Sequence, residues 1–208
     1  MVFKLKNDGE KLVKYKARLV VKGFAQKQGI DFNEIFSLVM KMTSIRVVLG
    51  LVASMDLKFE QLDVKTAYLH GDLKEKIYME QPEGFEVRGK KHLICRLKKS
   101  LYGLKQAPRQ WYMKFDSFIM DQGYRRTVAD HCVYVKKFPD GNFVILLLYV
   151  DDMLRVGQDA NVMHRLKGEL FKSFDTKDLS PAKQIFGMKI LHDRKTKRLC
   201  LSQEKYVE

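Results

Sequence analysis

The 208-residue chain of 24.4 kDa is long enough to bury a hydrophobic core without disulfides or metals, and 46% of its residues are hydrophobic, which excludes a wholly disordered basic chain. Its 39 Lys and Arg against 25 Asp and Glu leave a net charge of +14, which favours an anionic partner, nucleic acid first and an acidic membrane second. An ordinary basic, solvated surface is the alternative.

The cysteines, the amino terminus and the apolar runs together predict where in the cell the protein is found. Cys95, Cys132 and Cys200 are odd in number and widely spaced, which supports neither a disulfide framework nor a zinc site. The amino terminus is charged by Lys4 and lacks the apolar segment of a secretory signal. The longest apolar run, residues 143–150, is far shorter than the roughly 20 residues of a membrane helix. We therefore expect a soluble, intracellular, cytoplasmic protein with no membrane partner.

The chain begins with a predicted β-hairpin. Val2 to Lys6 is the first strand, Asn7-Asp8-Gly9 the turn, and a longer extended run through Val21 the second strand. Two stretches hold many cations and no acid: residues 11–30 contain six Lys and Arg, and residues 88–109 contain eight. These fourteen residues equal the net charge of the chain in number.

Two helices and a strand are predicted next. Thr43 or Ser44 is a suitable N-cap for a helix with apolar residues at positions i, i+3, i+4 and i+7, which predicts one buried face. Those apolar residues are Ile45, Val48, Leu49 and Val52. Residues 58–64 alternate as a strand does and deliver Asp63 at its end. Pro108 suits the first turn of a second helix that ends at Gly123. We expect its apolar residues to lie in the core rather than to stack on bases: Trp111, Phe115, Phe118 and Ile119.

The strongest local pattern is a strand pair that leads into an acidic turn. Residues 132–137 and 143–150 predict two antiparallel strands, the second central and buried. Asp151 and Asp152 follow directly, and residues 153–156 predict a return strand. The last predicted elements are a helix with Leu166 and Leu170 and a strand pair around Ile190 and Leu199. Because strands and helices follow one another without a βαβα rhythm, the sequence predicts an α+β fold.

The adjacent carboxylates after a buried strand suggest a metal site. Mg²⁺ prefers oxygen ligands and is commonly held by one or two carboxylates together with substrate phosphates. Asp63, at the end of another strand, is the natural third carboxylate beside Asp151 and Asp152. Two such ions would support an in-line phosphoryl displacement. From these residues alone a solvated hairpin turn is the alternative, because Asp is a common turn residue.

Three segments of the chain, in this order, resemble motifs of the reverse transcriptase of copia-type retrotransposons. They are QLDVKTAYLHGD at 61–72, SLYGLKQAPRQW at 100–111 and YVDDML at 149–154. Shorter stretches at 16–24, 77–85 and 201–206 extend the resemblance over nearly the whole chain. The resemblance implies the fingers and palm of a right-hand polymerase, with an antiparallel palm sheet packed on helices.

The resemblance also implies a division of the chain and a set of site residues. Residues 1–60 and 73–110 would be fingers-like, and 61–72 and 111–208 palm-like, with no thumb, RNase H, protease or integrase domain. The implied catalytic residues are Asp63, Asp151 and Asp152, and the implied ligands of two Mg²⁺ ions, or of Mn²⁺ in their place, are Asp63, Val64, Asp151 and Asp152. The implied nucleotide and template contacts are Lys16, Arg18, Tyr68 and Gln106. For Tyr68 a half-buried aromatic is the alternative role, and for Lys16 and Arg18 a solvated basic strand.

The implied function is an RNA-directed DNA polymerase domain that acts on an RNA or DNA template with a primer and on deoxynucleoside triphosphates. In the intact element such a domain would work in a cytoplasmic virus-like particle. Arg155 departs from the family, which has an aliphatic residue there, and a buried guanidinium needs a carboxylate partner. The alternative function is a catalytically inactive, truncated retroelement remnant that only binds nucleic acid.

Overall fold

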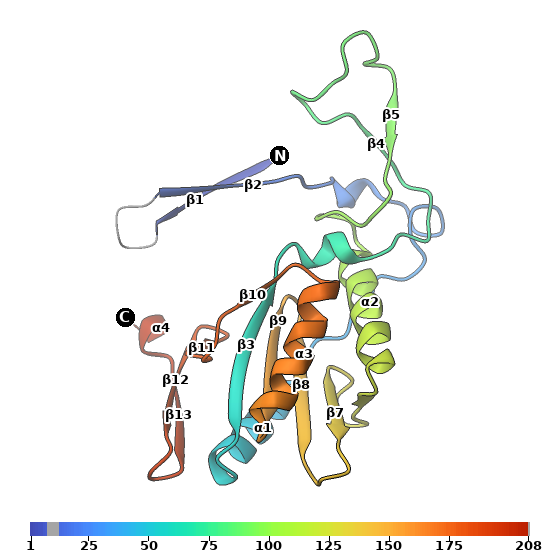
Figure 1. The fold of residues 1–208 in the computed structure, drawn as a ribbon. Helices are drawn as coiled ribbons and strands as arrows, with labels where there is room; N and C mark the ends of the chain where they lie inside the picture. Colours follow the sequence, from blue (N-terminus) through green and yellow to red (C-terminus); the bar gives the residue numbers. More distant parts are fainter. Residues whose placement is uncertain (8–12, 208) are drawn as a thin grey trace. The chain divides into compact units, whose positions relative to one another are not determined.

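A computed structural model describes residues 1–7 and 13–207 and divides the chain into two compact units. Unit 1 comprises Met1–Ser37 and Ala67–Phe115, and unit 2 comprises Leu38–Thr66 and Asp116–Glu208. Both units combine antiparallel strand pairs with helices, as the predicted α+β class requires (Figure 1). No helix in the described part of the chain combines the length and the apolar character needed to cross a membrane.

Unit 2 is built on a six-stranded antiparallel sheet with the strand order β10-β3-β9-β8-β7-β6. The strands are β3 (Lys58–Val64), β6 (Arg125–Arg126), β7 (Val133–Lys137), β8 (Phe143–Tyr149), β9 (Asp152–Gly157) and β10 (Thr176–Asp178). Strand β8 lies between β9 and β7, and its five central residues are buried, which confirms the predicted central, buried strand.

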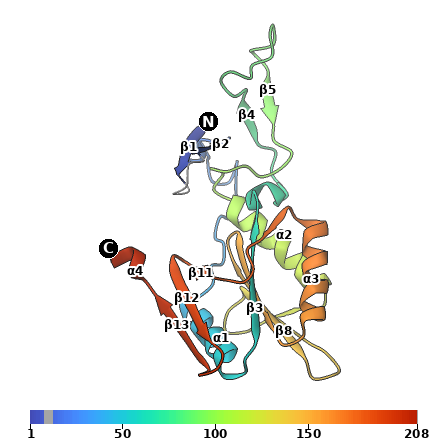
Figure 2. The ribbon, with the colours of Figure 1, turned by 60° about the vertical axis from the view of Figure 1, so that its left-hand side comes forward.

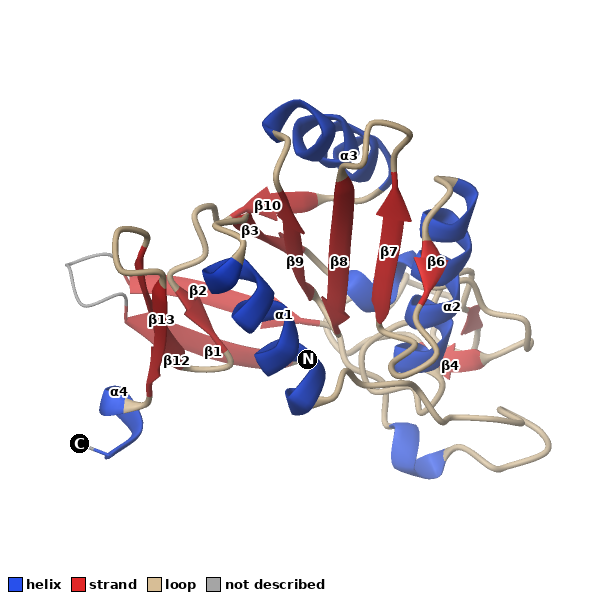
Figure 3. Cartoon of the chain, turned by 90° about the horizontal axis from the view of Figure 1, so that it is seen from below, coloured by secondary structure: helices blue, strands red, loops and turns tan. Residues whose placement is uncertain are grey.

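Two helices cover opposite faces of this sheet, α3 (Ala160–Ser173) above and α1 (Met42–Ser54) below in the view of Figure 3. Each buries one apolar stripe. That of α1 consists of the four residues predicted for it, and that of α3 consists of Met163, Leu166 and Leu170. Helix α2 (Ala107–Asp121) has Pro108 in its first turn and is followed by Gly123 at φ 79°, as predicted. Trp111, Phe115 and Ile119 are buried, which confirms that they are core residues, whereas Phe118 is only half-buried.

The predicted N-cap of α1 was wrong. The helix begins at Met42, and its N-cap, Lys41, makes no side-chain capping bond. Instead the Asp130 carboxylate accepts hydrogen bonds from the Lys41 backbone N–H at 2.8 Å and from the Ser44 hydroxyl at 2.6 Å. A carboxylate from a distant loop therefore takes the place of a local cap at the positive end of the helix.

The last part of unit 2 forms a smaller, three-stranded antiparallel sheet. Its strands are β11 (Gln184–Ile185), β12 (Met188–Asp193) and β13 (Arg198–Ser202). Strands β12 and β13 are the predicted final strand pair. Strand β13 packs beside α1, as Figure 2 shows, and a short helix, α4 (Glu204–Val207), comes after it.

Unit 1 contains two strand pairs and two short 3-10 helices. The pairs are β1 (Val2–Asn7) with β2 (Val13–Arg18), and β4 (Tyr78–Glu80) with β5 (Ile94–Arg96). The 3-10 helices are η1 (Gly23–Ala25) and η2 (Ala67–His70). The β1–β2 pair confirms the predicted hairpin, while its turn at Asp8-Gly9 lies outside the described residues. A small core forms around Ile77, Leu104 and Ala107.

Two glycines let the two acid-free stretches meet in unit 1. The Val21 N–H donates to the Tyr102 carbonyl oxygen at 2.8 Å, so the two backbones run in direct contact. A Cβ at Gly23 would lie 1.8 Å from the Gly103 carbonyl oxygen, and one at Gly103 would lie 2.1 Å from the Val21 carbonyl oxygen. Neither position has room for a side chain, so glycine is required at the crossing.

Candidate active site

The acidic pair lies at the tight turn between β8 and β9, as predicted. Val150 occupies the first turn position with φ 56°, Asp151 follows it, and Asp152 is the first residue of β9. The Val64 N–H donates to the Asp151 carbonyl oxygen at 2.8 Å. In the β3–β9 pairing Asp63 stands directly opposite Asp152. The register of two strands therefore brings the three carboxylates to one end of the sheet.

The charges at this turn repel one another. Burial raises the pKa of Asp152, and the negative charges of Asp151 and Asp63 raise it further, whereas a hydrogen bond that Gln61 Nε2 donates at 3.0 Å opposes the shift. Carboxylates that disfavour each other's ionised form are the kind of donor set that a cation stabilises. Among the described residues, no group of three or more His, Cys, Asp and Glu side chains stands together as a ready metal site.

A pocket of about 400 Å³ adjoins Asp152. Its lining consists of Gln61, Asp152, Leu179, Lys183, Gln184, Phe186 and Gly187. The Tyr149 ring, at the end of β8, packs edge-on against Phe186 with ring centroids 4.1 Å apart. Phe186 was not predicted from the sequence, because only its φ of 49° in a turn before Gly187 distinguishes it.

The predicted nucleotide contacts Lys16, Arg18, Tyr68 and Gln106 all belong to unit 1, whereas the three aspartates belong to unit 2. Arg18 and Tyr68 both contact a further residue, the aromatic Tyr102. The Arg18 guanidinium lies 5.0 Å above the Tyr102 ring, and that ring lies 5.0 Å from the ring of Tyr68. Tyr102, which the sequence reasoning missed, lies inside the quoted segment 100–111. Lys16 is exposed on β2 and stands opposite Lys4 on β1.

Gln106 is fully buried, and its side-chain amide is used inside unit 1. Its Nε2 donates to the Asp31 carbonyl oxygen at 2.9 Å, and its Oε1 accepts from Gln26 Nε2 at 3.0 Å. These bonds favour a structural role, in which Gln106 fixes the loop around Asp31. Its contact with a template stays a prediction.

Arg155 is fully buried, and its charge has the carboxylate partner that the sequence analysis expected. It stands opposite Glu60 in the β3–β9 pairing and forms an ion pair with it. It also donates to the Met163 carbonyl oxygen of α3 at 2.6 Å. Burial lowers the pKa of Arg155, and the charge of Glu60 raises it. Because side chains alternate along a strand, this pair faces α3, away from the Asp63 and Asp152 side.

Comparisons with known proteins agree on one family. The family described as Reverse transcriptase (RNA-dependent DNA polymerase) matches residues 1–208. The chain is 70% identical over its whole length to a Retrovirus-related Pol polyprotein from transposon TNT 1-94 of Nicotiana tabacum, of which it covers 16%. The Retrovirus-related Pol polyprotein from transposon RE1 of Arabidopsis thaliana is 39% identical over 98% of the chain, and the chain covers 14% of that polyprotein. A Transposon Ty1-DR1 Gag-Pol polyprotein of Saccharomyces cerevisiae is 30% identical over 98% of the chain, and the chain covers 11% of it. No solved structure matches the chain.

Proposed function

Because the chain belongs to the reverse transcriptase family, as the domain of a copia-type Pol polyprotein, we propose that it transfers deoxynucleotides to the 3′-hydroxyl of a primer on an RNA or DNA template. The observation that supports this proposal is the position of Asp63 opposite Asp152, with Asp151 in the adjoining turn, at one end of the unit 2 sheet. In the same proposal the fingers-like residues 1–60 and 73–110 lie mostly in unit 1, and the palm-like residues 61–72 and 111–208 lie mostly in unit 2.

Members of this family generally use divalent metal ions, and in this proposal Asp63, Val64, Asp151 and Asp152 would hold two Mg²⁺ ions. The available donors are carboxylate oxygens and the backbone carbonyl of Val64, which are the hard ligands that Mg²⁺ prefers. Burial, and to a smaller extent the charges of Asp151 and Asp63, raise the pKa of Asp152, and a bound cation would favour its ionised form. When bound, such ions lower the pKa of an attacking hydroxyl and neutralise charge on the phosphoryl oxygens.

The chain's own residues orient this chemistry. Gln61 holds the Asp152 carboxylate through the hydrogen bond at 3.0 Å, so that its other oxygen stays available. The β3–β9 hydrogen bonds fix Asp63 opposite it. The turn at Val150 sets Asp151 just beyond the end of β8. A rigid sheet therefore holds the ligands, which reduces the reorganisation needed when substrate binds.

For the nucleotide we propose that Tyr68 lies under the incoming sugar, where its ring would exclude a 2′-hydroxyl and favour deoxynucleotides. The Tyr68 ring contacts the ring of Tyr102, over which Arg18 lies. Lys16 and Arg18 lie on β2, and Lys16 stands opposite Lys4 on β1. Like charges in this position repel each other and destabilise the strand pair, and a bound phosphate would reduce that repulsion.

Primer extension on an RNA template with Mg²⁺ tests the catalytic assignment. Asp151→Asn keeps the shape of the side chain but removes a charged ligand, and we expect the rate of extension to fall by at least about 100-fold. Asp121→Asn, at an exposed position at the end of α2, is the matched control and should extend as the unchanged protein does. Equal extension by the Asp151→Asn and unchanged proteins would contradict the assignment.

The second candidate function is nucleic-acid binding without catalysis. The charge of unit 1 favours it, because unit 1 has 19 Lys and Arg against nine Asp and Glu, whereas unit 2 has 20 against 16. Binding of a primer and template by the unchanged protein, with no extension under any divalent cation, would support this candidate. Binding that survives Asp151→Asn while extension is lost would support the polymerase.

A further inference from the structure

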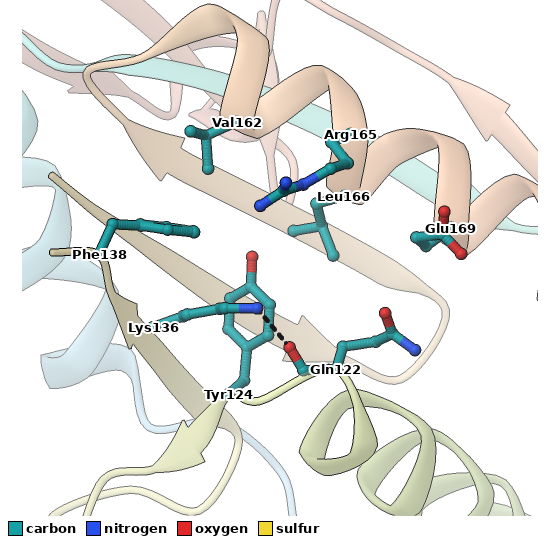
Figure 4. A pocket seen from close by; sticks show the side chains of 8 residues that line it. All are labelled: Gln122, Tyr124, Lys136, Phe138, Val162, Arg165, Leu166 and Glu169. Atoms are coloured by element: carbon teal, nitrogen blue, oxygen red, sulfur yellow. Dashed lines mark hydrogen bonds between the residues drawn. The ribbon is translucent and has the colours of Figure 1, made fainter. Parts of the chain in front are cut away.

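Unit 2 has a second pocket, of about 230 Å³, at the end of the sheet away from the acidic turn (Figure 4). It is lined by Gln122, Tyr124, Lys136, Phe138, Val162, Arg165, Leu166 and Glu169. The acidic turn follows the Tyr149 end of β8. Lys136 and Lys137 pair with Val144 and Phe143 at the other end of the same strand. The pocket is therefore no part of the proposed catalytic site.

Lys136 gives the pocket a cation in a fixed position. Its Nζ donates to the Gln122 carbonyl oxygen at 2.6 Å. The same Nζ lies 5.5 Å from the ring centroids of both Tyr124 and Phe138. An ammonium group has three donor hydrogens, so this one keeps two for a ligand. Two aromatic rings and a backbone carbonyl therefore hold a cation that is not neutralised by a carboxylate in the described part of the chain.

Tyr124 gives the pocket a hydroxyl group. The residue is 3% exposed, and its hydroxyl points into the pocket in Figure 4. Burial raises the pKa of Tyr124 to about 12, while the charges of Arg155 and Arg165 act in the opposite direction. The phenol therefore keeps its proton at neutral pH, and it can donate a hydrogen bond to a ligand in the pocket.

Helix α3 supplies the second cation. The Arg165 guanidinium extends from the helix over the pocket in Figure 4, and Leu166 beside it forms part of an apolar floor. Glu169 is the one carboxylate in the lining, and it already forms an ion pair with Lys172 at 2.9 Å. The charge presented to a ligand is therefore positive, from two sides.

We propose that this pocket binds a phosphate group, held by Lys136, Arg165 and the Tyr124 hydroxyl. A guanidinium and an ammonium are the side chains that most often bind phosphate in proteins, and a neutral hydroxyl adds a third donor between them. The volume also accommodates a small group attached to the phosphate, which would lie against Phe138 and Val162. The same chemistry fits a free phosphate or phosphomonoester and a phosphodiester of a nucleic acid.

A nuclear magnetic resonance titration of the full chain with inorganic phosphate at constant ionic strength tests the proposal. We expect saturable shifts of the signals of Tyr124, Lys136 and Arg165. Tyr124→Phe and Arg165→Gln should each weaken phosphate binding by about tenfold, which corresponds to one hydrogen bond to a charged group. Arg46→Gln, at an exposed position of α1, is the matched control and should leave binding unchanged. Shifts that do not saturate, or an equal effect of Arg165→Gln and Arg46→Gln, would overturn the proposal.

A second titration, with a short single-stranded oligonucleotide that lacks a terminal phosphate, separates the two sources. If Arg165→Gln weakens binding of both probes and phosphate competes with the oligonucleotide, the pocket takes a phosphodiester. If the variant weakens phosphate binding alone, the pocket takes a small phosphate compound. Because Asp151→Asn leaves this pocket intact, phosphate binding by that variant distinguishes the pocket from the catalytic proposal.

Discussion

Arg155 and Glu60 hold a charge pair inside unit 2, where a charge without a partner would be costly. The Arg155 side chain is fully buried, whereas that of Glu60 is 33% exposed. The guanidinium uses its terminal nitrogens for Glu60 and for the Met163 carbonyl oxygen, and its Nε has no partner among the described residues. The pair compensates for the burial of the charge more than it adds stability of its own.

This arrangement predicts a strong effect of removing one partner. Glu60→Gln leaves the buried guanidinium without a carboxylate, and we expect the free energy of unfolding to fall by about 2 to 3 kcal/mol, since Glu60 is partly solvated. Adding Arg155→Leu to that variant should recover part of the loss, because the uncompensated charge is then removed. Urea unfolding measures both effects. Glu83→Gln, at an exposed position, is the control, and an equally small effect of Glu60→Gln would contradict this account.

At the scale of the elements, Asp130 connects the start of α1 to the loop before β7. Its Oδ2 accepts from the Lys41 N–H and the Ser44 hydroxyl, and its Oδ1 accepts from the Cys132 N–H at 3.0 Å. Burial acts to raise the pKa of Asp130, but the hydrogen bonds from Ser44, Lys41 and Cys132 outweigh it and the pKa is lowered. The carboxylate therefore stabilises the fold in its ionised form.

We expect Asp130→Ala to lower the free energy of unfolding by about 1 to 3 kcal/mol at pH 7, through the loss of a helix cap and of buried hydrogen bonds. Because the pKa is lower in the folded state, the charged form contributes fully above about pH 3.9, the ordinary value for Asp, and this contribution is lost as the pH falls through the lowered pKa. The difference between the two proteins should therefore narrow in strong acid.

Urea unfolding of both proteins at pH 7 and at low pH measures this effect. The control is Asp121→Ala, at an exposed position at the end of α2. A difference that widens as the pH falls would show that the ionised carboxylate does not support the cap.

At the scale of the whole molecule, most of the net positive charge belongs to unit 1, because unit 1 has few acidic residues. The backbone crossing at Gly23 and Gly103 joins the two acid-free stretches there. Binding of single-stranded nucleic acid through such a surface releases counterions, so affinity falls with salt. If about four phosphates are contacted, the affinity should fall by about 50-fold between 50 and 200 mM salt.

Fluorescence anisotropy of a labelled oligonucleotide measures this salt dependence. Replacing Lys16 and Arg18 together by Gln should reduce the slope by one to two phosphates, whereas Arg46→Gln in unit 2 should leave it unchanged. A slope near zero for the unchanged protein would show that the charge of unit 1 is ordinary surface charge.

Several elements were predictable because their patterns are local. The buried run of β8, the turn at Asp151 and Asp152 and the apolar stripe of α1 each follow from hydrophobic periodicity over a few residues. The short strands β6, β10 and β11 were not predicted, because strands of two or three residues carry too few positions to show a period.

The sequence by itself determined the family, the α+β class and the three aspartates, since these depend on residue identity and on spacing along the chain. Only the tertiary structure decided that Asp63 stands opposite Asp152, that Glu60 compensates Arg155 and that Asp130 caps a helix some ninety residues away. It also decided that Tyr124, Lys136 and Arg165 line one pocket. Such contacts join residues that are far apart in the chain, and strand register and packing bring them together, which local preferences do not encode.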